Sequence, residues 1–283
     1  MPPRGQHDHG SELRREARAA SLPPAEDPGV SDAITLSLAE RPVHTLVADC
    51  IAADRLAGLD AKQIAELPVL HGGRPETLGA FFKVRGGRSS IVRVEGDLAR
   101  VAAIGAGMAG GELTIDGSVG RDLGLAMSGG RIDVRGSAGD NAGGARPGAA
   151  RGMTGGEIIV RGNVGDEAGA RMRRGTIAVT GDGGRGTGVG MIAGTVVVFG
   201  TAGPGAGRFL KRGSIVALGP IDRPGTFRYA CTYRPPHVGL LLRYLRGRAD
   251  VPVADRYVAG KYERHSGDLA ELGKGEILKW VGE

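Results

Sequence analysis

Between Met108 and Gly219 the chain alternates apolar and polar residues in short runs that recur at a fixed spacing. Six copies read MAGGELTIDG, MSGGRIDVRG, MTGGEIIVRG, MRRGTIAVTG, MIAGTVVVFG and LKRGSIVALG. They begin at Met108, Met127, Met153, Met172, Met191 and Leu210, so the period is 19 residues with one insertion of seven, and a fainter copy, GRSSIVRVEG, begins at Gly87. A short fixed period predicts a solenoid in which each copy contributes a strand and buries its apolar residues on its neighbours.

Counting from the leading Met or Leu, positions +5 and +7 are apolar in every copy, and we predict that they point inward while +4, +6 and +8 point outward. The inward pairs are Leu113/Ile115, Ile132/Val134, Ile158/Val160, Ile177/Val179, Val196/Val198 and Ile215/Ala217. Successive copies should stack about 4.8 Å apart. The predicted fold is all-β, a parallel β-helix of about seven 19-residue coils with small flanking α/β segments.

Glycine also recurs at positions +12 and +16, for example at Gly120 and Gly124. A glycine at a fixed place in every copy predicts a corner that needs positive φ or very close backbone approach. The GxGxxG match from Gly105 to Gly110 falls on these corners. A strand-like run, ELTID, follows it, whereas a dinucleotide-binding fingerprint requires a helix there, so the glycines are interpreted as architecture.

The outward positions change character along the repeats. Positions +6 and +8 are Thr114/Asp116 and Asp133/Arg135 in early copies but Val197/Phe199 and Val216/Leu218 in late ones. An apolar patch of this kind is normally covered. Either the chain's own C-terminal segment or another subunit should lie on it, and Val197, Phe199, Val216 and Leu218 are therefore the candidate partner-interface residues.

The repeats divide the chain into four parts. Residues 1–30 are rich in Pro, Arg and Glu and are expected to be a disordered tail. Residues 31–86 should be a capping segment, with a strand at Ile34–Leu38 and a helix that starts at Asp60. Residues 87–219 are the β-helix repeats. Residues 220–283 hold Phe227, Trp280 and all five tyrosines and should form a docking segment with a helix after Pro235 and Pro236.

Composition narrows the partners and the compartment. The formal net charge is +6, but no aromatic residues interleave with the basic ones in the repeats, so nucleic acid is not an expected partner. Two cysteines, Cys50 and Cys231, lack a metal-ligand spacing, so we expect no metal and a reducing cytoplasm. The apolar stretch VGLLLRYL is too short to span a membrane.

The candidate chemistry is limited to one basic cluster. No nucleophile, acid–base pair or metal-ligand set has a recognisable spacing, so no catalytic residue is predicted. Equal repeat positions place one group of basic residues over another two coils away, and such an edge could bind a polyanion or could be a solvated rim. The basic edge comprises Arg171, Arg173, Arg174, Arg208, Lys211 and Arg212.

Three further stretches, Asp49–Asp54, Ile64–Arg74 (IAELPVLHGGR) and Leu78–Val84 (LGAFFKV), together with the repeats, resemble the C subunit of formylmethanofuran dehydrogenase. The resemblance extends to the C subunit of the bacterial formyltransferase/hydrolase complex of methylotrophs and covers about residues 31–250. The repeat motif alone also resembles the C-terminal domain of the glutamate synthase large subunit.

The resemblance implies a non-catalytic scaffold subunit in one-carbon metabolism. In that family the partner subunits transfer a formyl group between tetrahydromethanopterin and a methanofuran-type coenzyme, and release formate. The coenzyme carries linked glutamates, which suit the basic edge. No cofactor is expected to be bound by this chain alone. The alternative is a β-helix spacer domain of an amidotransferase.

Overall fold

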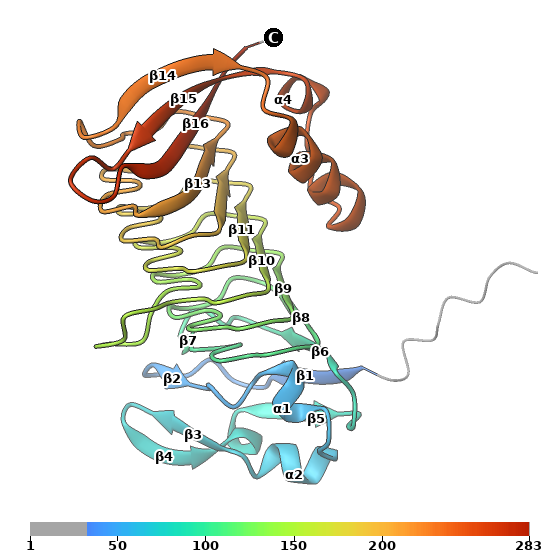
Figure 1. Cartoon of the computed structure of the whole chain (residues 1–283). Coiled ribbons are helices and arrows are strands. Elements are labelled where there is room, and N and C mark those ends of the chain that lie inside the picture. The colour runs from blue at the N-terminus through green and yellow to red at the C-terminus, as the bar shows by residue number, and fades with distance from the viewer. Residues whose placement is uncertain (1–32, 283) are drawn as a thin grey trace, which may run out of the picture. The chain divides into compact units, whose positions relative to one another are not determined.

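One large mixed sheet contains most of the strands, in the order β14-β15-β16-β13-β12-β11-β10-β9-β8-β6-β1-β5. Figure 1 presents the computed structural model, in which residues 33–282 are described. The predicted tail, residues 1–30, lies outside this part. The described chain is mostly β, with short helices towards both ends.

Strands of the repeats stack in parallel, one per copy. They are β6 (Ile91–Glu95), β8 (Glu112–Asp116), β9 (Arg131–Val134), β10 (Glu157–Val160), β11 (Thr176–Val179), β12 (Thr195–Val198) and β13 (Arg212–Ala217). Residues at position +4 face one another across every pair, and Arg131 pairs with Glu157 despite the seven-residue insertion between them. A second column of single parallel bridges runs through position +11, from Leu98↔Val119 to Ala202↔Ile221.

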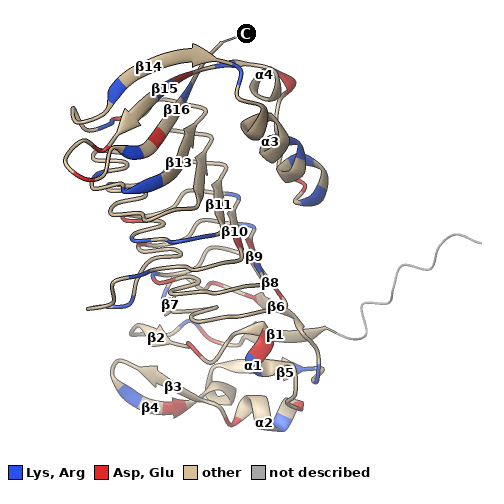
Figure 2. Cartoon of the chain, in the orientation of Figure 1, with Lys and Arg blue, Asp and Glu red and all other residues tan. Residues whose placement is uncertain are grey.

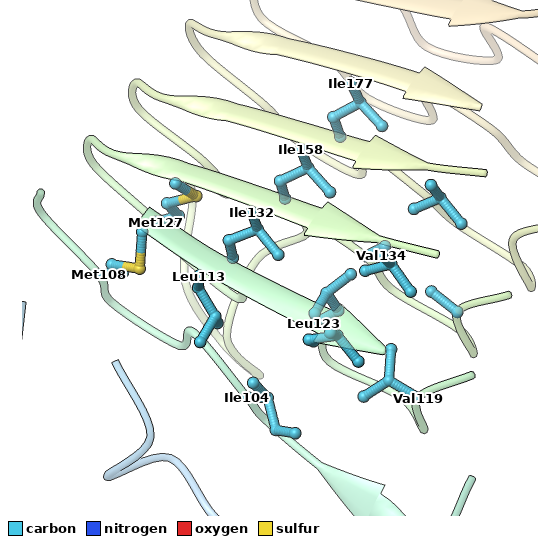
Figure 3. Packing of buried hydrophobic residues seen from close by; sticks show 14 of the residues in the cluster. Ile104, Met108, Leu113, Val119, Leu123, Met127, Ile132, Val134, Ile158 and Ile177 are labelled. Atoms are coloured by element: carbon cyan, nitrogen blue, oxygen red, sulfur yellow. The ribbon is translucent and has the colours of Figure 1, made fainter. Parts of the chain in front are cut away.

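The inward positions build the main core, as the alternation predicts. All twelve +5 and +7 side chains are buried, and the leading methionines and Leu210 are buried with them. Figure 3 shows these side chains as continuous rows: Leu113, Ile132, Ile158 and Ile177 follow one another from layer to layer, with Met108 and Met127 beside them. The core is therefore thin and repetitive, which suits a composition with few aromatic residues.

The recurring glycines satisfy both conditions that their spacing predicts. At position +16, Gly124 has φ +58°, and a Cβ there would lie 2.6 Å from Ile158 Cδ1. At position +12, Gly139 has ordinary φ, but a Cβ would lie 2.8 Å from the backbone nitrogen of Arg121. One column of glycines thus supplies backbone geometry and the other permits close stacking.

The segment before the repeats contributes to two sheets. Strand β1 (Ile34–Leu38) occupies the predicted residues and pairs in parallel with β6. A smaller sheet has the order β4-β3-β2-β7. The other elements before the repeats are β2 (Leu46–Val47), α1 (Ala53–Leu56), α2 (Ala61–Ala65), β3 (Pro68–His71), β4 (Arg74–Thr77), the 3₁₀ helix η1 (Leu78–Ala80) and β5 (Phe82–Arg85). Strand β7 (Val101–Ala102), which completes the smaller sheet, belongs to the first, fainter copy.

Helix α2 begins as its sequence predicts. Asp60 accepts a hydrogen bond from the Gln63 amide at 2.9 Å, and the Gln63 side chain accepts one from the Asp60 amide at 3.0 Å, which completes a capping box. Ile64 is buried in the main core. The helix ends before Pro68, where β3 starts.

After the repeats the chain returns to the sheet. Its elements are β14 (Arg228–Tyr233), α3 (Pro236–Arg248), α4 (Asp255–Val258), β15 (Lys261–Gly267) and β16 (Lys274–Gly282). Strand β16 adds in parallel to β13, with Ile277 beside Ile215, and β15 then pairs antiparallel to β16. Helix α3 starts at the predicted prolines and lies beside the outer face of the late strands (Figure 1).

The apolar outer face is covered by this returning segment. Val197, Val216 and Leu218 are buried, and Phe199 is half-buried. They form a second apolar cluster with α3 residues such as Leu242 and with Leu278 of β16. The sequence left open whether the chain's own C-terminal segment or another subunit covers this face. In the structure, the C-terminal segment covers it. In this arrangement the four candidate interface residues make internal contacts rather than presenting a surface to a partner.

Candidate functional site

The turns at one corner of the layers line a groove of about 970 Å³. Its lining comes from successive copies, and the seven-residue insertion forms a loop, residues 145–151, that projects from the stack along one wall (Figure 1). Polar groove residues are Arg121, Asp122, Asp140, Asn141, Arg146, Glu167, Arg171, Lys211 and Glu271. Apolar ones include Val189, Ile192 and Phe209.

Only part of the predicted basic edge lines this groove. Backbone hydrogen bonds from Ile192 to Met172 (2.7 Å) and from Lys211 to Met191 (2.9 Å) stack the repeat starts in register, as expected. Only Arg171 and Lys211 line the groove. The other four residues do not line it, and they are Arg173, Arg174, Arg208 and Arg212.

The four excluded residues occupy different surroundings. Arg173 is half-buried, whereas Arg174, Arg208 and Arg212 are exposed. The Arg208 guanidinium lies 4.8 Å from the centre of the Phe209 ring, within cation–π range. Figure 2 shows basic residues at the start of β13, where Arg212 lies, and on the projecting loop. The six residues therefore form a stacked series, of which two line the groove and four lie outside it.

Sequence reasoning missed several groove residues, although position +14 carried a signal. Asp122, Asn141 and Glu167 occupy it in successive copies and all have positive φ, at 65°, 63° and 60°. Asp and Asn tolerate this conformation better than most residues, and glycine takes over in later copies. The corner thus presents a column of polar side chains towards the groove. Arg146 was missed because it belongs to the insertion and has no counterpart in other copies.

Charges in the groove are partly paired. Arg121 Nε lies 2.7 Å from Asp122 Oδ2, and this hydrogen-bonded partner raises the pKa of Arg121. Lys211 Nζ lies 4.0 Å from Glu271 Oε2. Arg171 donates a hydrogen bond to the Ala149 carbonyl at 2.9 Å, which ties the projecting loop to the corner. Within residues 33–282, neither Arg146 nor Arg171 has a carboxylate partner at ion-pair distance.

One reactive group outside the groove, the Cys50 thiol, is buried. Burial, with a smaller contribution from Asp49, raises the pKa of the Cys50 thiol to about 11, so this thiol stays protonated. Across residues 33–282, no group of three or more His, Cys, Asp or Glu side chains is arranged to hold a metal ion. The groove can bind and orient a charged ligand through its guanidinium, ammonium and carboxylate groups.

The helices are short or carry many polar residues. Within the described part of the chain, no helix combines the length and apolar character needed to cross a bilayer.

Curated sequences match a part of this chain, although no protein-family model matches it. The C subunit of molybdenum-containing formylmethanofuran dehydrogenase 1 from Methanothermobacter marburgensis is 40% identical over 81 residues, which cover 28% of this chain and 20% of the relative. The C subunit from Methanosarcina barkeri is 38% identical over 80 residues, 26% of this chain and 27% of the relative. These matches span only a minor part of the curated relatives' lengths.

A solved structure matches over nearly its whole length. A chain in the crystal structure of the formyltransferase/hydrolase complex (FhcABCD) from Methylorubrum extorquens in complex with methylofuran is 34% identical, with a TM-score of 0.75. The match covers 87% of this chain and 99% of that chain. Together with the curated matches, it confirms the resemblance drawn from the residues, and the chain belongs to the family of formylmethanofuran dehydrogenase C subunits.

Proposed function

We propose that this chain is a non-catalytic scaffold subunit of a formyltransferase/hydrolase complex. The complex would act in the cytoplasm in one-carbon metabolism, with formyl transfer between tetrahydromethanopterin and a methanofuran-type coenzyme followed by release of formate. The observation that carries this proposal is the likeness to a chain crystallised within FhcABCD with methylofuran, which covers 87% of this chain and 99% of that chain. The curated relatives are C subunits, which supports the same position in the complex.

The stacked layers would form the scaffold as a parallel β-helix of about seven coils in residues 87–219. Three observations support this architecture: the in-register parallel strands, the second column of bridges at position +11, and the uninterrupted inward rows. Residues 31–86 would close the first coil, and residues 220–283 would close the last. Each end needs such a cover because a solenoid otherwise exposes its core.

The corner groove would guide the glutamylated tail of the coenzyme. Support comes from the two groove cations without a carboxylate partner among the described residues, Arg146 and Arg171, and from Lys211, whose contact with Glu271 is long. Groove carboxylates such as Glu167 oppose the binding of a polyanion, so the contribution should be a weak, salt-sensitive capture. Chemistry would remain with the partner subunits, in keeping with the family resemblance.

Purification through a tag on this chain tests the proposed assembly. Co-expression with the other subunits of a formyltransferase/hydrolase complex should give one species in native mass spectrometry that contains this chain at a fixed stoichiometry. Exchange of the tag to another subunit should recover the same species. Recovery of this chain without those subunits from either tagged preparation would contradict the proposal.

Two matched double variants test the groove within the assembled complex. Arg146→Gln with Lys211→Gln removes two groove charges, and Arg174→Gln with Arg212→Gln removes two charges outside it. The groove variant should raise the apparent KM for the glutamylated coenzyme a few-fold at low salt, with kcat unchanged, and the difference should shrink at high salt. Equal KM values for both variants and the unmodified complex would show that the groove does not guide the coenzyme.

The amidotransferase alternative receives no support from these observations. The relatives are formylmethanofuran dehydrogenase subunits and a chain of the formyltransferase/hydrolase complex.

A further inference from the structure

A second hollow lies at the C-terminal end of the layers, away from the groove. Strand β16 continues the inward rows: Ile277 follows Ile215, and Lys279 follows Ala217 at the place where earlier layers have valine or isoleucine. On β15, His265 lies directly opposite Ile277, and Glu263 lies opposite Lys279. Directly opposite residues of an antiparallel pair point to the same face. A row that is aliphatic through the stack therefore ends in charged and imidazole side chains.

These side chains surround a hollow of about 340 Å³. Its remaining wall comes from the last corner of the repeats, where Ile221 ends the column of position +11 bridges. The lining residues are Ile221, Asp222, Arg223, Glu263, His265 and Lys279. If β15 and β16 only covered the end of the core, aliphatic side chains would suffice at these positions. Packing of the layers therefore does not explain the polar lining.

The hydrogen-bonding capacity of this lining is largely unused. His265 is only 4% exposed, yet its Nδ1 has no hydrogen-bond partner among the described residues. A buried polar atom without a partner is rare, so this nitrogen is not held by an ordinary core hydrogen bond. Arg223 donates to the Phe227 carbonyl at 3.2 Å, and within residues 33–282 neither Arg223 nor Lys279 has a carboxylate at ion-pair distance.

We propose that this hollow binds an oxyanion, a carboxylate or a phosphate group, between Arg223 and Lys279, beside the His265 imidazole. Arginine and lysine together favour an anionic ligand over a cation, and the guanidinium can contact two oxygens at once. Asp222 and Glu263 limit the net positive charge, so a small ligand with one or two charges fits better than a polyanion.

Anion binding should be linked to proton uptake at His265. Burial lowers the pKa of His265 and Arg223 adds to this, whereas Glu263 opposes it and Lys279 contributes in the same direction as Arg223. Glu263 Oε2 lies 4.0 Å from Nε2, and the Tyr229 ring packs edge-on against the imidazole at 6.0 Å. An anion between Arg223 and Lys279 would offset the effect of these two cations and, together with Glu263 beside Nε2, would favour the doubly protonated imidazolium. One proton is then taken from solvent, and binding should tighten as the pH falls.

Titration of the full chain with inorganic phosphate and with succinate tests the site. Both salts should raise the melting temperature relative to chloride at equal ionic strength, and calorimetry should detect binding that strengthens from mildly alkaline to mildly acidic pH. The variant Arg223→Gln with Lys279→Gln should lose this effect, and His265→Gln should lose its pH dependence. The control Arg228→Gln with Lys274→Gln changes the charge equally outside the hollow and should keep it.

A second arm separates a free anion from a carboxylate of a partner chain, and this arm alone rests on the proposed function. If neither salt binds, but the Arg223/Lys279 double variant no longer joins the complex while the control does, the anion is a partner's side chain. If the salts shift the double variant as much as the unmodified chain, the proposal fails. It also fails if neither salt binds and both variants assemble equally. If the control variant assembles, the chain does join the complex. A negative result for the hollow then counts against the anion site and not against the proposed function.

Discussion

The same outward row of the repeats meets water at one end of the stack and the chain itself at the other. At position +6, Thr114 and Asp133 in β8 and β9 are half-buried, whereas Val197 and Val216 in β12 and β13 are fully covered. The backbone pairing is identical in both regions. The difference shows that, in a repeat fold, the polarity of the outward side chains depends on whether water or another segment covers the face. The inward side chains are apolar in every copy.

The early outer face is organised by ion pairs. Arg93 and Arg135 lie 3.4 Å and 3.0 Å from the Asp116 carboxylate, and Arg131 lies 3.7 Å from Glu157. Exposed pairs of this kind contribute little individually. Their main consequence here is a face that stays wetted and specific in register.

Arg161 joins the two regions. Its guanidinium contacts Asp133 at 3.0 Å and donates at 2.8 Å to the carbonyls of Ala249 and Asp250, just after α3. The hydrogen-bonded Asp133 raises the pKa of Arg161. The C-terminal end of α3 is thus fixed to the last of the charged layers.

The largest predicted effect on stability comes from an asparagine at the covered end of the outward +6 row, compared with an asparagine at its solvated end. Val197→Asn buries an amide and leaves a packing defect beneath α3, and it should lower the free energy of unfolding by about 4 kcal/mol. Thr114→Asn, at the same repeat position, should change it by less than about 0.5 kcal/mol. Urea denaturation measures both. Similar losses for the two variants would mean that burial by α3 does not distinguish the regions.

The next largest loss of stability should come from truncating the buried face of α3. Leu242 of α3 is buried against the outer face, whereas Leu240 two residues earlier is 63% exposed. Leu242→Ala should cost about 3 kcal/mol, and Leu240→Ala should be close to neutral. Thermal and urea denaturation of the two variants compare them directly. A neutral Leu242→Ala would indicate that α3 is not docked in solution.

Asp268→Asn, at the corner that contains Phe209, should lower the free energy of unfolding by about 2 kcal/mol in a pH-dependent way. In earlier layers the corner amide donates to the next layer, as Gly190 does to the Arg208 carbonyl at 2.8 Å. At Phe209 the copy that follows does not supply this carbonyl, and the Phe209 amide donates instead to Asp268 Oδ2 at 2.9 Å. Asp268 is 1% exposed, so its carboxylate replaces the missing carbonyl.

The sign of the pH dependence follows from the Asp268 carboxyl. Burial alone would raise its pKa, but the Thr226 hydroxyl, the amides of Ala270 and Phe209, and the charge of Arg208 together lower it. Its stabilisation is therefore fully present above the ordinary carboxyl pKa of about 3.9 and is lost as the pH falls through the lowered value. The deficit of Asp268→Asn should be constant at neutral pH and shrink in acid. A pH-independent deficit would contradict this assignment.

The smallest effect on stability is expected from removing the insertion. Deletion of residues 145–151 restores the 19-residue period and should change the free energy of unfolding by about 1 kcal/mol or less, because the projecting loop adds little to the core. It removes the groove wall that carries Arg146. Denaturation and the coenzyme KM of the assembled complex measure the two consequences. A deletion variant that fails to fold would show that the loop is structural.

Residue patterns predicted the fold better than the site. The period, the alternation and the glycine positions depend on local rules repeated in every copy, so the inward rows and the start of α2 at Asp60 follow from the sequence. The groove depends on where an irregular loop turns back, and the repeat register contains no information about Arg146. The cover of Val197 could not be decided, because an apolar outer face has the same composition under a helix of its own chain as under a partner.

Turnover measured on the isolated chain and on the assembled complex tests the central claim most directly. The complex should transfer the formyl group and release formate, whereas the isolated full chain, shown to be folded by circular dichroism, should do neither above background. Activity of the isolated chain that is abolished by substitution of one of its own residues would contradict the scaffold assignment.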